Sequence, residues 1–192
     1  MKHTFIYMLL LCLSLAGQAH AQRYLPGMKG IQITGGLSDN MRFHSGDGSG
    51  YHAGLAMATY TKNANRWVIG CEYLEKKYSY KNDLYPVAQI TGEGGYYMKF
   101  LSDAGKNVFA SLGLSALAGY ETVNWGEPQL PDGSRLTDED NFIYGGALTF
   151  EIETYLTDRI VILLNARERM MFGGDCGRFH TQIGIGLKII IN

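Results

Sequence analysis

The feature that most constrains this chain is a strict two-residue alternation near its end. Across residues 179–191, six of the seven odd positions carry apolar side chains, whereas only one of the six even positions does. Successive side chains of a β-strand point to opposite faces, so this pattern predicts a strand with one apolar and one polar face. Residues 108–121 repeat the pattern, with apolar side chains at the even positions.

Six further segments alternate less sharply, at residues 31–38, 50–60, 66–73, 88–100, 142–153 and 160–169. None of the eight segments has the period of an amphipathic helix, so they predict an all-β fold. The connections between them differ in length, from the long 122–140 and a medium loop at 79–85 to a tight turn at 157–159. Long loops at one end and short turns at the other are typical of outer-membrane barrels. We therefore predict an eight-stranded antiparallel up-and-down β-barrel of outer-membrane type.

The polar face decides between two kinds of barrel. A soluble lipocalin-like barrel turns its apolar face inward around a core or a ligand, whereas a membrane barrel turns that face to lipid. Here the polar face combines glycines with side chains of opposite charge, which suits a narrow interior that must be filled and neutralised. The predicted lumen charge network comprises Arg66, Glu72, Glu93, Glu151, Glu153, Arg167, Arg169 and Lys188. A soluble periplasmic barrel that binds an apolar ligand stays as the alternative.

Two carboxylates and two guanidinium groups flank the tight turn at 157–159. Antiparallel pairing across this turn places Glu151 opposite Asn165 and diagonal to Arg167. The favoured interpretation is a network of salt bridges that neutralises buried charge. The other interpretation, a hydrolase site in the lumen, is weaker because no His or Ser nearby completes a catalytic set.

The N-terminus has the pattern of a signal peptide. A short polar start precedes an apolar run at residues 5–15, and the segment closes on Ala19-His20-Ala21. Signal peptidase cleaves after such a motif of small residues, so we predict cleavage between Ala21 and Gln22. The apolar run is too short to span about 30 Å of hydrocarbon. The prediction is a signal peptide over 1–21 and a single barrel domain over 22–192.

Composition and motifs narrow the function classes. The 17 Lys and Arg residues balance 18 Asp and Glu residues, and no basic stripe is present, so direct binding of nucleic acid is not expected. The chain lacks the nucleotide-binding, zinc-protease and serine-hydrolase motifs, and its histidines are scattered, so we expect no cofactor, no metal and no enzyme activity. Cys71 and Cys176 do not make a disulfide framework. The longest loop carries Trp125, Asp138 and Asp140, which we take as a candidate contact loop.

Several stretches together resemble one family. They are Ala16 to Arg23 followed by Leu25-Pro26, Ile90 to Tyr96, Ala118 to Asn124, and Glu153 to Arg159 followed by residues 161–164. In this order and spacing, over essentially the whole chain, they resemble the TraO family of conjugative-transposon proteins. The resemblance implies a part in the conjugative transfer apparatus of a mobile element and brings no catalytic residue.

Combined with the barrel prediction, the resemblance leads to one expectation. The protein would be a non-enzymatic component of the apparatus that acts as an anchor or assembly factor. It would lie in the outer membrane of a Gram-negative bacterium, with membrane lipid and other conjugation proteins as partners.

Overall fold

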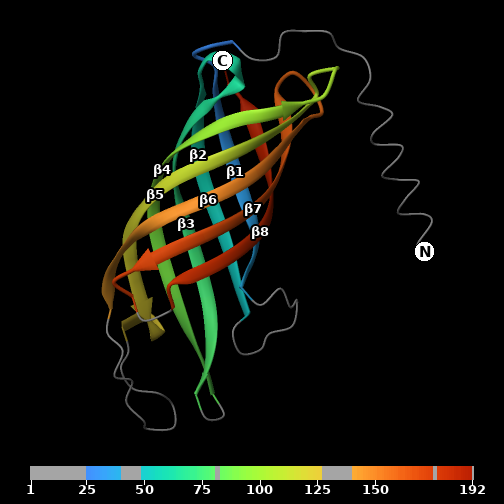
Figure 1. Cartoon of the computed structure of the whole chain (residues 1–192). Helices are drawn as coiled ribbons and strands as arrows, with labels where there is room; N and C mark the ends of the chain where they lie inside the picture. Colours follow the sequence, from blue (N-terminus) through green and yellow to red (C-terminus); the bar gives the residue numbers. More distant parts are fainter. Residues whose placement is uncertain (1–24, 40–48, 81–82, 127–139, 175–176, 192) are drawn as a thin grey trace, which may run out of the picture.

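The alternating segments form the strands of a closed barrel in the computed structural model (Figure 1), which describes residues 25–39, 49–80, 83–126, 140–174 and 177–191. Within these residues, eight antiparallel strands each pair with the next along the chain, and β8 pairs back with β1. The strands are β1 (Lys29–Asp39), β2 (Ser49–Tyr60), β3 (Arg66–Tyr80), β4 (Asp83–Ser102), β5 (Val108–Val123), β6 (Asn141–Tyr155), β7 (Ile160–Phe172) and β8 (Phe179–Ile190). The predicted fold class is confirmed.

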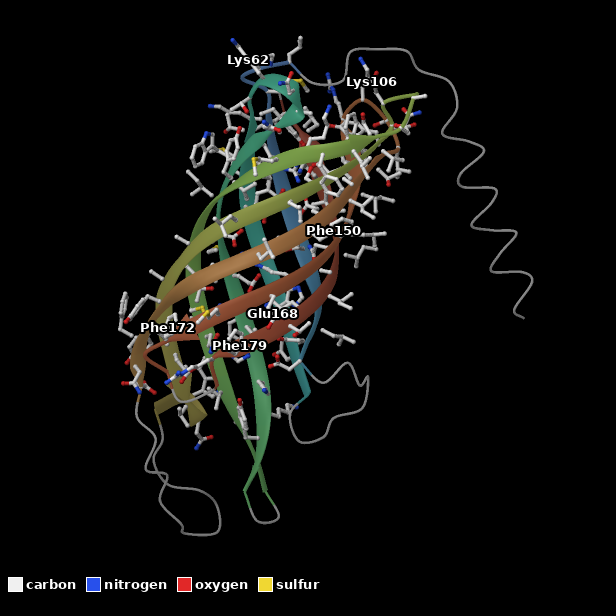
Figure 2. All side chains as sticks on the ribbon, in the orientation of Figure 1. Lys62, Lys106, Phe150, Glu168, Phe172 and Phe179 are labelled. Atoms are coloured by element: carbon white, nitrogen blue, oxygen red, sulfur yellow. The ribbon has the colours of Figure 1, made fainter. Side chains whose placement is uncertain are left out.

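The two faces of the strands separate cleanly between the outside and the bore. Leu114 on β5 is 70% exposed and Ile185 on β8 is 60% exposed, as an outward-facing apolar side chain should be. Arg66, Arg169 and Lys188 are fully buried inside. Figure 2 shows Phe150, Phe172 and Phe179 projecting from the outer wall. The apolar face of the alternation is therefore the outer face, as predicted.

Short turns close one end of the barrel. Between β2 and β3, a 3-10 turn, η1 (Lys62–Ala64), is closed by the Thr61 amide, which donates to the Asn65 carbonyl at 2.7 Å. Between β4 and β5, Asp103 accepts hydrogen bonds from the amides of Asn107 and Val108. These connections lie at the end of the barrel that carries the C-terminus (Figure 1), and β1, β3, β5 and β7 finish at the opposite end. We call these the turn end and the loop end.

The predicted loop at 79–85 is wrong. β3 continues to Tyr80 and β4 starts at Asp83, so the two strands extend as a paired hairpin. The polar composition of this stretch resembles a loop, but the hairpin protrudes at the loop end (Figure 1), where no lipid-facing or lumen-facing pattern is required. At its base, Val87 packs on Val123 and Tyr78, which supports continued pairing.

Some predicted features lie outside the described residues. They are the signal peptide with its cleavage site at Ala21 and Gln22, and also Asp138 and Cys176. Among the residues that the structure does describe, no helix is both long and apolar enough to cross a membrane.

Candidate functional site

The bore of the barrel contains all eight charged side chains of the predicted lumen network, arranged as two groups. The group nearer the turn end consists of Arg66, Glu151, Glu153 and Lys188. Nη2 of Arg66 lies 2.6 Å from Oε1 of Glu151, and its Nη1 lies 3.1 Å from Oε2 of Glu153. The ammonium of Lys188 contacts Glu153 and lies 3.9 Å from Oε1 of Glu151. With two cations and two anions, this group is neutral.

Neighbouring polar and aromatic side chains complete the turn-end group. Tyr60 donates its hydroxyl hydrogen to Oε1 of Glu153 at 3.0 Å and accepts a hydrogen bond from Lys188 at 3.1 Å. Cζ of Arg66 lies 4.9 Å from the centre of the Tyr97 ring, a cation–π geometry that is favourable away from water. Each charge in the group is thus held by more than one partner.

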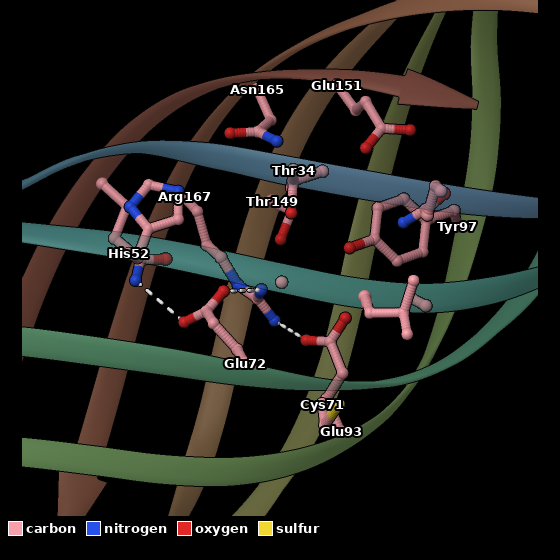
Figure 3. Close-up of a pocket in the computed structure, with 15 residues that line it drawn as sticks. Thr34, His52, Cys71, Glu72, Glu93, Tyr97, Thr149, Glu151, Asn165 and Arg167 are labelled. Atoms are coloured by element: carbon pink, nitrogen blue, oxygen red, sulfur yellow. Dashed lines mark hydrogen bonds and ion pairs between the residues drawn. The ribbon is translucent and has the colours of Figure 1, made fainter.

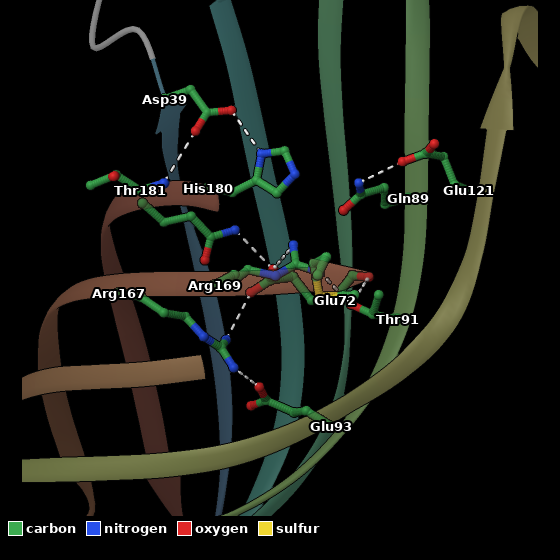
Figure 4. Close-up of polar contacts among 12 residues, drawn as sticks. Asp39, Glu72, Gln89, Thr91, Glu93, Glu121, Arg167, Arg169, His180 and Thr181 are labelled. Atoms are coloured by element: carbon green, nitrogen blue, oxygen red, sulfur yellow. Dashed lines mark hydrogen bonds and ion pairs between the residues drawn. The ribbon is translucent and has the colours of Figure 1, made fainter. Parts of the chain in front are cut away.

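The group nearer the loop end consists of Glu72, Glu93, Arg167 and Arg169 (Figure 4). Nη1 of Arg167 lies 3.0 Å from Oε2 of Glu72, and Nη1 of Arg169 lies 2.9 Å from Oε1 of the same carboxylate. Arg167 also pairs with Glu93. The amide of Gln182 donates to Oε1 of Glu72 at 2.9 Å. This group too contains two cations and two anions, so neither layer leaves a net charge in the bore.

The register across the β6–β7 turn is as the sequence predicts, since Glu151 pairs with Asn165. However, the partner of Glu151 is Arg66 from β3, not Arg167. Glu151 and Glu153 are buried, and each carboxylate forms an ion pair with a cation of the bore. The arrangement has the chemistry of a structural network.

A cavity of about 20 Å³ separates the two groups (Figure 3). The figure shows Arg167 between Glu72 and Glu93, with Tyr97 and Glu151 across the cavity. Buried Nδ1 of His52 and Oε1 of Gln182 also line it and have no hydrogen-bond partner among the described residues. A space of this size and polarity accommodates about one water molecule. Small-molecule sites are usually above about 300 Å³, so a substrate does not fit.

Apolar side chains pack in the bore beside each charged group. At the turn end the cluster comprises Tyr60, Ala64, Phe109, Tyr155, Val161, Leu163 and Ile190. Toward the loop end it comprises Leu117, Ile143, Ala147 and Met171. Such packing excludes water from the ion pairs and strengthens their attraction. The described part of the bore is therefore filled by side chains rather than open as a channel.

The contact-loop residues Trp125 and Asp140 lie at the rim of the loop end. Trp125, in the 3-10 turn η2 (Asn124–Gly126), stacks on Tyr73 with ring centres 6.5 Å apart and planes inclined by 15°. Asp140 accepts hydrogen bonds from the Val123 amide at 3.1 Å and the Tyr120 hydroxyl at 3.4 Å. Both residues thus hold the ends of the long β5–β6 connection against the wall, and Trp125 keeps 60% of its surface exposed.

Sequence reasoning missed several polar residues of the bore. Gln182 and Thr91 hold the loop-end group, and Gln89 donates to Glu121 at 2.8 Å. At the rim, Asp39 contacts His180 at 2.9 Å and Lys76 at 2.9 Å. Gln89, Thr91, Glu121, His180 and Gln182 occupy inward positions of the two-residue period. The two-residue period that places the charged network inside the bore also places these residues there, so strand parity is the signal that could have found them.

A comparison with known protein families identifies the family of this chain. The family model described as "Conjugative transposon protein TraO" matches residues 25–191. This chain belongs to the TraO family. The match covers the whole described barrel, so the resemblance seen in the sequence is confirmed. No match was found among curated proteins.

Several solved structures are similar to this TraO family member. Neisserial surface protein A matches with a TM-score of 0.59 and 12% sequence identity, covering 87% of this chain and 98% of that one. A de novo designed transmembrane β-barrel matches with a TM-score of 0.43 and 9% sequence identity, covering 88% of this chain and 98% of that one. The transport unit of the autotransporter AIDA-I from Escherichia coli matches with a TM-score of 0.35 and 13% sequence identity. This match covers 96% of this chain and 97% of that one. The first likeness supports an outer-membrane type of barrel.

Proposed function

We propose that this TraO family protein is a non-enzymatic outer-membrane barrel that anchors or assembles the conjugative transfer apparatus of a mobile element. One observation carries the membrane part of the proposal. The outer wall is apolar, whereas the bore contains two neutral layers of ion pairs. Family membership supports the part in conjugation.

The outer wall suits a lipid bilayer. Closure pairs the strand edges with one another, which is required because unpaired backbone groups in hydrocarbon cost several kcal/mol each. Exposed aromatic side chains lie near the strand ends, with Tyr120, Phe142 and Phe179 toward the loop end and Trp67 and Phe100 toward the turn end. Aromatic girdles at both interfaces are typical of transmembrane barrels. A lipocalin-like barrel would instead have an apolar interior, whereas the apolar clusters of this bore lie beside two groups of buried ion pairs.

The bore does not support transport or hydrolysis. The carboxylates of the two charged groups are paired with cations, and the cavity between these groups holds about one water molecule. A nucleic acid strand cannot pass through side chains packed in this way. The protein therefore acts through its outer surface and its rim, with lipid and other conjugation proteins as its partners.

The membrane part is tested by cell fractionation and by gel migration of unheated and heated samples. We expect the protein in the outer-membrane fraction of a Gram-negative host, with heat-modifiable migration and a mature N-terminus at Gln22 by mass spectrometry. A soluble periplasmic pool would contradict the proposal.

The conjugation part is tested by deleting the gene and measuring transfer frequency. We expect a large loss that the intact gene restores in trans. The matched control is complementation with Lys62→Ala, which alters an exposed side chain in a short turn and should transfer normally. Unchanged transfer after the deletion would contradict a role in the apparatus.

A further inference from the structure

Glu168 on β7 is an exposed carboxylate among apolar neighbours on the described part of the outer wall. Glu168 pairs with Leu148 on β6 and Thr181 on β8, and it follows Ala166 in the outward series of its strand. Figure 2 places Glu168 between Phe150, toward the turn end, and Phe172 and Phe179, toward the loop end. Since these phenylalanines belong to the apolar outer wall, Glu168 lies within the band that the proposed function places in lipid.

The carboxylate of Glu168 lacks the neutralisation that the bore provides for its own carboxylates. Its recorded partner among the described residues is the Thr181 hydroxyl, which donates to Oε2 at 2.6 Å. A hydroxyl carries no charge, and no cationic side chain among the described residues pairs with Glu168. Ionisable side chains in the hydrocarbon region are expensive and mark functional sites. By contrast, Glu75, an acidic residue of the outer wall on β3, accepts hydrogen bonds from the hydroxyls of Tyr51 and Tyr73.

We infer that the wall around Glu168 binds a membrane-embedded segment of a partner protein that carries a Lys or Arg side chain at this depth. The inference rests on the proposed function, because it requires the barrel to lie in a membrane. A cation from the partner would neutralise the carboxylate where water cannot. Leu148 lies directly beside Glu168 on β6, and two small residues, Ala166 two positions along β7 and Gly146 diagonally across on β6, leave room near the carboxylate for a partner side chain.

Charge argues against the other occupants of this face. A two-fold contact between two copies would pair this patch with itself, and the outward positions of β6, β7 and β8 carry no Lys or Arg that could neutralise Glu168. The phosphate groups of lipid headgroups are anionic and would be repelled. A basic partner segment is the occupant whose charge is complementary.

The test is a charge reversal with a matched control on the opposite wall. Glu168→Lys is compared with Cys71→Lys, which places the same charge on β3, four strands away in the closed ring of eight. Heat-modifiable migration and outer-membrane location establish that both variants fold. We expect Glu168→Lys to reduce transfer frequency at least tenfold relative to Cys71→Lys. Equal transfer by the two variants would overturn the inference.

The neutral variant Glu168→Gln covers the case in which Glu168→Lys does not fold. It retains shape and hydrogen bonding, so we expect normal folding and a several-fold loss of transfer. Wild-type transfer would overturn the inference. Wild-type protein found outside the outer membrane would instead refute the proposed function, so the two failures are distinguishable.

Suppressor selection identifies the partner chemistry. The selection starts from the Glu168→Lys variant and collects second-site substitutions that restore transfer. We expect these substitutions to replace a Lys or Arg by Asp or Glu, in a membrane-spanning segment of another protein of the mobile element. A photo-crosslinking residue at position 166 should form an adduct with the same segment, and one at position 71 should not. Suppressors confined to this chain, or adducts with lipid or a second copy alone, would overturn the inference.

Discussion

Arg66 on β3 reaches across the bore to Glu151 on β6, with Nη2 2.6 Å from Oε1. Arg167 on β7 reaches Glu72 on β3 in the same way, at 3.0 Å. Both contacts join strands that are not neighbours in the barrel. The charged groups thus tie distant parts of the wall together, which backbone pairing between adjacent strands cannot do.

The first prediction concerns Lys188 and Glu153, which contact each other in the turn-end group. Removing one partner leaves the other charge buried without full compensation, so Lys188→Met or Glu153→Met alone should lower the free energy of unfolding by about 3–5 kcal/mol. The double variant should cost less than the sum of the two single changes. Urea unfolding in lipid vesicles measures the free energy of unfolding of the wild type, the two single variants and the double variant, with Lys62→Ala as the control. Strict additivity would show that the two residues do not act as a pair.

The second prediction tests which wall faces lipid. Leu114→Lys places a charge at one of the most exposed apolar positions of the outer wall and should cost about 2–4 kcal/mol in a bilayer. Leu156→Lys is the matched control, because Leu156 is 60% exposed but lies just after β6, in a turn. Near the interface the cost should fall below about 1 kcal/mol. The yield of folding into lipid vesicles distinguishes Leu114→Lys from Leu156→Lys. Equal yields of the two variants would contradict a lipid-facing wall.

The third prediction uses two glycines on opposite faces. A Cβ at Gly113 would lie 2.5 Å from the Tyr97 ring in the bore, whereas a Cβ at Gly94 would have no heavy atom within 4 Å. Gly113→Ala should therefore destabilise the barrel by about 1–3 kcal/mol through overpacking. Gly94→Ala should change the free energy of unfolding by about 0.5 kcal/mol or less. A Gly113→Ala barrel as stable as wild type would show that the ring has room to move.

The fourth prediction concerns Cys71, which is exposed on the outer wall. In a Cys176→Ser background, lipid should shield this thiol from a charged, membrane-impermeant maleimide in intact cells. An apolar maleimide should label it. Both reagents should react after unfolding in detergent, which serves as the control for thiol reactivity. Rapid labelling of folded protein by the charged reagent would place Cys71 in water.

Much of the fold follows from the sequence because local rules determine it. The two-residue period fixes which side of each strand faces out, and the length of the β6–β7 turn fixes Glu151 opposite Asn165. Neither rule depends on distant parts of the chain.

The choice of ion-pair partners could not be predicted in the same way. Arg66 and Glu151 are 85 positions apart, and they meet only because the closed, tilted barrel brings β3 and β6 to the same level. The contact of Asp39 with His180, 141 positions apart, depends on the closing pair β1–β8. Both relationships require the stagger of the strands around the ring, which no single segment encodes.

The filled bore has a consequence for the cell that carries this protein. A barrel whose interior is occupied from one apolar cluster to the other offers solutes no route across the membrane. A recipient that acquires the gene should therefore keep its permeability barrier against large antibiotics and detergents even at high expression. A mobile element gains from this, because its spread does not depend on weakening the envelope of its new host.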